Sequence, residues 1–135
     1  MRQSNIELSK YRLEKAKEHL KSAENLLKNK HFRDSISRSY YAVFSAARAI
    51  LALKELDSKK HSGVISLFNQ NFVKTGLINV DASKIIKEAK SYRENADYKD
   101  FFIISKEDTE KQLKNAERFI KEIENKIKNF PEGLC

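Results

Sequence analysis

Few residues in this chain interrupt helices or form cross-links. Its 135 residues include one cysteine, one proline, three glycines and no tryptophan. The single cysteine, Cys135, excludes an internal disulfide framework and a zinc site built from several cysteines. Because Pro131 is the only proline, long helices are permitted throughout the preceding chain. No apolar run approaches the ~20 residues that cross a bilayer. The first residues lead into an amphipathic segment rather than a signal-peptide core, so we expect a cytoplasmic protein with no membrane partner.

Charge is plentiful and is unevenly distributed. The net charge is +8, and residues 1–33 alone hold nine Lys/Arg against four Asp/Glu. The last part of the chain, 105–135, is balanced. A basic surface favours phosphates, nucleic acid or an acidic partner. The alternative is a lysine-rich helical protein whose charges only meet water, since the lysines are scattered and not interleaved with aromatic residues.

Two amphipathic segments open the chain. The first shows helical apolar periodicity from Ser4 onward, and Glu7 follows three residues later as in a capping box. The second runs from about Phe32 or Asp34 to Leu56 and is apolar almost all round in its middle. A helix of that kind is normally central and contacts several neighbours.

Three further helices are predicted after a short loop. One stops at Gly76, a residue type that favours helix ends. The next starts near Asp81 and fades after Ala96, so that residues 97–104 form a loop. The last opens at Ser105, again with acidic residues in its first turn.

Five helices without a strand pattern predict an all-α fold, an antiparallel bundle of about five helices. We expect one domain over 1–135, with a core of about 4–128 and a short C-terminal tail of 129–135. Five short helices would leave part of the apolar central helix exposed, so we also expect a homodimer.

One segment, 92–101, carries the most specific pattern in the chain. Arg93 is followed by Asp97 four residues later and by Tyr98 five residues later. Together with Tyr-Tyr-Ala-Val-Phe at 40–44 and His-Ser-Gly-Val-Ile at 61–65, this segment resembles the HEPN family (higher eukaryote and prokaryote nucleotide-binding domains). The resemblance extends from roughly residue 11 to residue 127 and implies a HEPN-like helical bundle.

The resemblance also implies a candidate site. Many HEPN ribonucleases carry an arginine, four to six residues, and then a histidine. Here Arg93 matches the arginine, but Tyr98 occupies the histidine position, giving an Arg-x4-Tyr branch. In those ribonucleases the arginine binds the scissile phosphate in a cleft between protomers, and cleavage uses the 2′-hydroxyl without metal. A phenol of pKa ~10 is a poor base at neutral pH. We name Arg93 and Tyr98 as the catalytic candidates.

Further phosphate-binding candidates surround this motif. Asp97 lies one turn from Arg93, and the alternative for this couple is an ordinary surface ion pair. Lys60 and His61 open the third helix, where free N–H groups bind anions; the alternative is a plain helix cap. Arg38 and Tyr41 lie on the central helix, where structural pairing is the alternative. Arg48 shares the apolar face of that helix and therefore needs a polar partner.

The sequence leads to three functional hypotheses. The first is a nucleotide- or RNA-binding HEPN module, weakly catalytic or inactive, that works with a small nucleotidyltransferase or a toxin–antitoxin partner. The second is a metal-independent endoribonuclease that uses Arg93 with Tyr98 or with His61. The third is a non-catalytic protein–protein interaction module. No cofactor and no metal ligands are expected, because no Gly-rich phosphate loop or metal-ligand cluster occurs.

Overall fold

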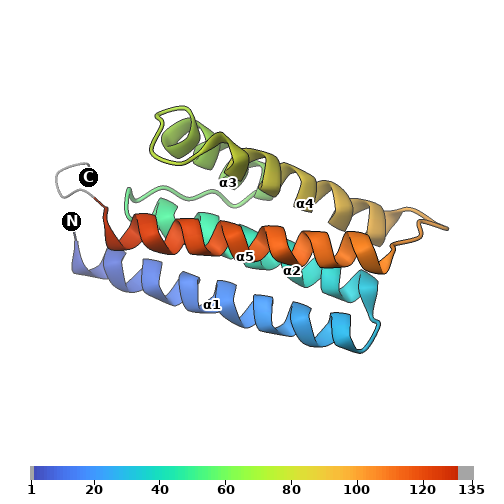
Figure 1. Cartoon of the computed structure of the whole chain (residues 1–135). Coiled ribbons are helices and arrows are strands. Elements are labelled where there is room, and N and C mark those ends of the chain that lie inside the picture. The colour runs from blue at the N-terminus through green and yellow to red at the C-terminus, as the bar shows by residue number, and fades with distance from the viewer. Residues whose placement is uncertain (1, 131–135) are drawn as a thin grey trace.

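Helices account for nearly all of the structure. The computed structural model describes residues 2–130, and this range contains five α-helices, one π-helical segment and no strand. The predicted all-α bundle is confirmed (Figure 1). Its elements are α1 (Gln3–Lys28), α2 (Phe32–Ala52), α3 (His61–Phe68), η1 (Asn69–Val73), α4 (Val80–Tyr98) and α5 (Lys106–Lys128).

Helix α2 is the centre of the bundle. It packs against α1, α3, α4 and α5, and α5 lies across it in Figure 1. Its alanines, including Ala42, Ala46 and Ala49, are fully buried, and even Phe44 is only 7% exposed. Small side chains let neighbouring helices approach closely. The apolar residues of α2 are therefore covered within one chain, and the expected exposed flank is wrong.

Two predicted helix starts have different outcomes. Helix α1 begins at Gln3 with Arg2 as its N-cap, and no side chain caps it. The capping box of Ser4 and Glu7 is therefore wrong. At α5 the side chain of Ser105 accepts a hydrogen bond from the backbone N–H of Asp108, at 3.0 Å, as the sequence predicted.

The helix ends also differ from expectation. Helix α2 stops at Ala52 instead of continuing to Leu56, and α3 continues as the π-helical segment η1 before Gly76, whose φ is +80°. Helix α4 extends through Tyr98, so Asp97 and Tyr98 are helical and the predicted loop begins later. Most of the predicted tail, including Cys135, lies outside the described residues.

None of the helices described between residues 2 and 130 combines the length and apolarity that crossing a membrane requires.

The buried aromatic rings provide a test of the assigned core. Phe119 is fully buried and packs 5.5 Å, centroid to centroid, from Phe68. We expect Phe119→Ala to lower the free energy of unfolding by ~3–5 kcal/mol, because it removes buried surface and leaves a cavity. Val80→Ala is the matched control, since Val80 is 59% exposed; its effect should stay within ~0.5 kcal/mol. Urea denaturation followed by circular dichroism measures both. Equal effects would contradict the assigned core.

Candidate phosphate-binding site

Arg93 lies on α4 against two tyrosines of α2. Its Nη2 donates a hydrogen bond to the hydroxyl of Tyr41 at 2.9 Å. The guanidinium carbon lies 5.2 Å from the Tyr41 ring centroid and 5.6 Å from that of Tyr40, within cation–π range. Nε lies 3.3 Å from Asp97 Oδ2. The side chain is only 20% exposed, so the guanidinium is held in one place by α2 and by its own helix.

His61 is the first residue of α3, and it contacts Tyr40. Its Nδ1 is 3.0 Å from the Tyr40 hydroxyl. The imidazole also packs on Phe44, at a centroid distance of 4.3 Å, and lies 6.2 Å from the Tyr41 ring. Residues from α2, α3 and α4 therefore meet in one cluster.

The hydrogen bond between Tyr40 and His61 couples the tautomer of His61 to the orientation of the Tyr40 hydroxyl. Burial raises the pKa of Tyr40 to about 12, so its hydroxyl keeps its proton. The pKa of His61 is lowered from its ordinary value, first by burial and then by the charges of Arg93, Lys90 and Arg48. Nδ1 accepts this bond in the tautomer of neutral His61 that carries its proton on Nε2, and it donates the bond in the other tautomer. Donation by the Tyr40 hydroxyl would leave Nε2–H of His61 as a donor for a ligand.

The cluster continues toward α1. Arg38 Nη1 lies 3.1 Å from Nδ1 of His19, and the His19 ring is 5.9 Å from that of Tyr41. These three residues line a pocket of about 670 Å³ together with Leu26, Asp34 and Ser37. Burial, followed by the charge of Arg38, lowers the pKa of His19. Arg38 and His19 therefore place a further basic group and a further ring beside Tyr41.

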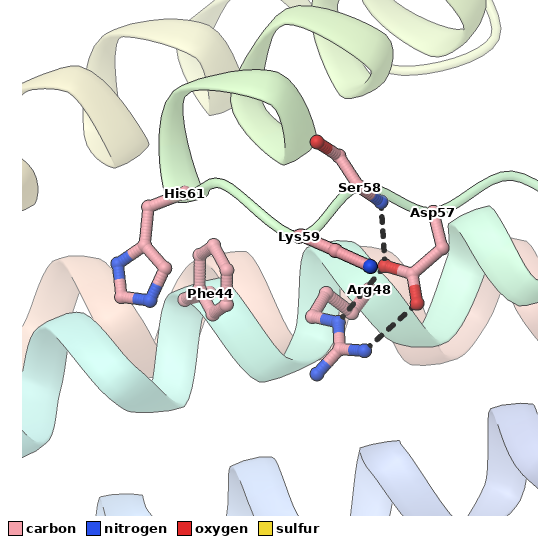
Figure 2. Close-up of a pocket in the computed structure, with 6 residues that line it drawn as sticks. All are labelled: Phe44, Arg48, Asp57, Ser58, Lys59 and His61. Carbon is pink, nitrogen blue, oxygen red and sulfur yellow. Dashed lines mark hydrogen bonds and ion pairs between the residues drawn. The ribbon is translucent and has the colours of Figure 1, made fainter.

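A second pocket, of about 540 Å³, lies beyond His61 (Figure 2). Asp57 organises it by accepting hydrogen bonds from Arg48 Nε and Nη2, at 3.3 and 2.9 Å. Asp57 also pairs with Arg12 of α1 at 3.3 Å and caps the N–H of Ser58 at 2.8 Å. The polar partner expected for Arg48 is thus Asp57, and the pairing fixes the segment that leads to His61.

Gly63 brings this segment onto α3. A Cβ atom at position 63 would lie 2.1 Å from Ser58 Oγ, which is closer than atoms can approach. The Ser58 hydroxyl in turn accepts a hydrogen bond from the N–H of Lys60 at 3.3 Å. The residue without a side chain therefore permits the tight approach that sets the start of α3, and with it the position of His61.

The structure groups some of the candidate residues and separates others. Arg93, Asp97 and Tyr41 are in direct contact, and Tyr40 connects them to His61. Arg38 joins the same surface through His19. Lys60 is exposed, and its backbone precedes His61 as the N-cap of α3.

Tyr98 stands apart. Its side chain is 74% exposed, and no contact joins it to Arg93 within the described range. Because five residues correspond to ~140° around a helix, Arg93 and Tyr98 face different directions.

Sequence reasoning did not single out Tyr40 or His19 as site residues. Tyr40 lies in the apolar middle of α2, where an aromatic residue indicates core packing. Its neighbour Tyr41 was named as a site residue. Successive residues of a helix point ~100° apart, so naming Tyr41 did not identify Tyr40 as well. His19 precedes Leu20, an apolar residue that packs against the core, and this adjacency was the available sign that His19 is half-buried.

Three groups of this cluster have donor hydrogens for a ligand. They are the guanidinium of Arg93, the hydroxyl of Tyr41, whose oxygen accepts from Arg93, and Nε2 of His61 in the tautomer that accepts from Tyr40. Such a set suits a phosphate, which presents only acceptors at neutral pH. No group of three or more His, Cys, Asp or Glu side chains between residues 2 and 130 is arranged to hold a metal ion.

Several known proteins are similar to this sequence over most of its length. Two proteins of Methanocaldococcus jannaschii, named "Putative toxin MJ0142" and "Putative toxin MJ0605", are each 38% identical over 118 residues, covering 87% of this chain. The alignments cover 78% and 87% of those proteins. A UPF0332 protein of Thermotoga maritima is 35% identical over 116 residues, which cover 86% of this chain and 88% of that protein.

The sequence pattern of the HEPN domain matches residues 9–126. This match includes α2, α3, α4 and most of α5, and hence every residue of the cluster around Arg93. The chain belongs to the HEPN domain family.

Proposed function

We propose that this chain is a toxin-type HEPN domain that binds RNA or nucleotides through the phosphate and cleaves them slowly or not at all. Arg93 makes the primary phosphate contact. Tyr41 and His61 supply the two further donors, and Asp97 orients the guanidinium. The observation that carries the proposal is the 3.0 Å contact between the Tyr40 hydroxyl and Nδ1 of His61, since donation by Tyr40 would make the nearest imidazole a donor at Nε2.

The assignment as a toxin rests on the relatives. Two of them carry the word toxin in their names and align over 87% of this chain. A toxin is neutralised by an antitoxin, and a small nucleotidyltransferase is the partner that the HEPN resemblance implies. The net charge of +8 suits an acidic partner surface.

A second candidate function is metal-independent RNA cleavage with His61 as the proton carrier. The proximity of His61 to the Arg93 cluster favours it over a mechanism through the outward-facing Tyr98. General-base action at Nε2 requires the other tautomer, with the proton on Nδ1. Donation by Tyr40 opposes that tautomer, so cleavage should be slower by some part of the ~10²–10⁴-fold that acid–base catalysis supplies.

Arg93 gives the first test. We expect Arg93→Ala to weaken binding of fluorescein-labelled RNA by ~10-fold or more in EDTA, since hydrogen bonds to charged groups contribute ~1.5–3 kcal/mol. Arg118→Ala is the control, because Arg118 is an exposed arginine of α5 outside the cluster. Fluorescence anisotropy measures the affinities, and gel electrophoresis follows cleavage. An unchanged affinity in Arg93→Ala would falsify the phosphate role. Rapid cleavage that His61→Ala abolishes and Tyr98→Phe spares would establish the second candidate instead.

The state of His61 gives the second test. Nitrogen-15 NMR should show Nε2–H, and the pKa of His61 should lie below 6.5. Arg93→Gln should raise this pKa by removing a nearby positive charge. Because the folded-state pKa is depressed, the unfolded chain binds a proton more readily. The stability contributed by neutral His61 is therefore complete above pH ~6.5 and declines as the pH falls below it. An Nδ1–H signature in the wild type would contradict the proposed donor role.

Pairing of two chains gives the third test. Three large apolar side chains at the end of α4 and in the segment after it are exposed: Tyr98, Phe101 and Ile103. Arg33 holds their loop by donating to the carbonyls of Ala96 and Phe102. We expect light scattering at micromolar concentration to give twice the monomer mass of 15.7 kDa. Ile103→Lys should shift the mass toward the monomer, whereas Val80→Lys, at another exposed apolar residue, should not. A monomeric wild type would remove the shared cleft from the proposal.

A further inference from the structure

The solvent-facing line of α2 is polar and basic. Between residues 38 and 50, the side chains that escape full burial are Arg38, Tyr41, Ser45 and Arg48. Their spacings of three, four and three residues place them on one face of the helix. We call these four residues the α2 line. A helix buried on its other sides thus keeps one open edge, and two of the four residues there are arginines.

Cations and rings alternate along this edge. His19 adjoins Arg38 and lies 5.9 Å, ring to ring, from Tyr41. Tyr41 carries Arg93 on its hydroxyl and lies 6.2 Å from the ring of His61. Cationic groups that follow a sugar–phosphate backbone, together with aromatic surfaces, are the pattern of single-strand nucleic-acid binding.

Each end of the α2 line opens into a pocket with its own cations. The pocket at one end contains Arg38 and His19, and the pocket at the other contains Arg48 and Lys59. Asp57 neutralises only one of the two arginines it contacts, since both Arg12 and Arg48 share it. Figure 2 shows the third guanidinium nitrogen of Arg48 turned away from Asp57. A positive charge therefore remains at the Arg48 end, whereas at the other end Arg38 shares its pocket with Asp34 and His19.

The length of the line exceeds what a single phosphate uses. Ten residues separate Arg38 from Arg48, and a helix rises ~1.5 Å per residue, so the two ends lie ~15 Å apart. A stacked strand places one phosphate every ~3.4 Å of its axis, so roughly four phosphates match this length. The phosphate site formed by Arg93, Tyr41 and His61 occupies only the middle of the α2 line.

We infer that the α2 line is a track for a single strand of RNA, with additional phosphate subsites at Arg38 and at the Arg48–Lys59 pocket on either side of Arg93. This inference rests on the proposed function and specifies its ligand. A mononucleotide uses the central subsite alone. A strand also engages both outer subsites, and its bases have the rings of His19 and Tyr41 beside them.

The test compares a fluorescein-labelled RNA decamer with uridine monophosphate. Arg38→Gln and Lys59→Gln alter exposed side chains outside the Asp57 pairs, so both variants should stay folded by circular dichroism. Each should weaken decamer binding several-fold at low salt and reduce the slope of log affinity against log salt by ~0.7, the value for one lost single-strand phosphate contact. Affinity for uridine monophosphate, measured by calorimetry, should not change.

Two comparisons separate the track from the central site. Arg93→Ala should weaken binding of both ligands, while Arg118→Gln on α5 should alter neither by more than a general charge effect on the decamer. If Arg38→Gln and Lys59→Gln bind the decamer with wild-type affinity and slope, the track is refuted, and the Arg93 site stands provided that Arg93→Ala still weakens both ligands. If Arg93→Ala has no effect either, the proposed function is refuted with it.

Discussion

Close approach of α1 to α2 is the constraint on which the other contacts depend. Ala16 and Ala23 of α1 are fully buried, as are the alanines of α2, so the two backbones lie near each other. The hydroxyl of Ser35 donates to the carbonyl of Ala23 at 2.8 Å across this contact. With larger side chains α1 would stand away from α2, and His19 could not lie beside Tyr41. The site is thus a consequence of small residues that take no part in it.

The adjacent residues Tyr40 and Tyr41 of α2 have different positions and partners in the site. Tyr40 is fully buried, and its hydroxyl lies 3.0 Å from Nδ1 of His61. Tyr41 points toward solvent and receives Arg93. Because successive helical residues point ~100° apart, two adjacent tyrosines can form one hydrogen bond in the core and another at the surface.

The sequence was sufficient to predict the elements whose chemistry is local. Apolar periodicity located the five helices, and Ser105 marked the start of α5 as an N-cap. The family pattern singled out Arg93. The tertiary partners were beyond it, because the bond from Tyr40 to His61 spans 21 residues and the pair of Arg12 with Asp57 spans 45. The end of α4 was placed too early because the helical spacing of Arg93 and Asp97 was read only as an ion pair and was not used to extend the helix.

The contact between Gly63 and Ser58 has a consequence for how this sequence can change. Since a methyl group at position 63 would overlap the Ser58 hydroxyl, the two positions cannot vary independently. Ser58 Cβ would also lie 2.8 Å from such a group, so loss of the hydroxyl alone does not make room for it. A side chain at position 63 therefore requires glycine at position 58 or a movement of the segment that leads to His61.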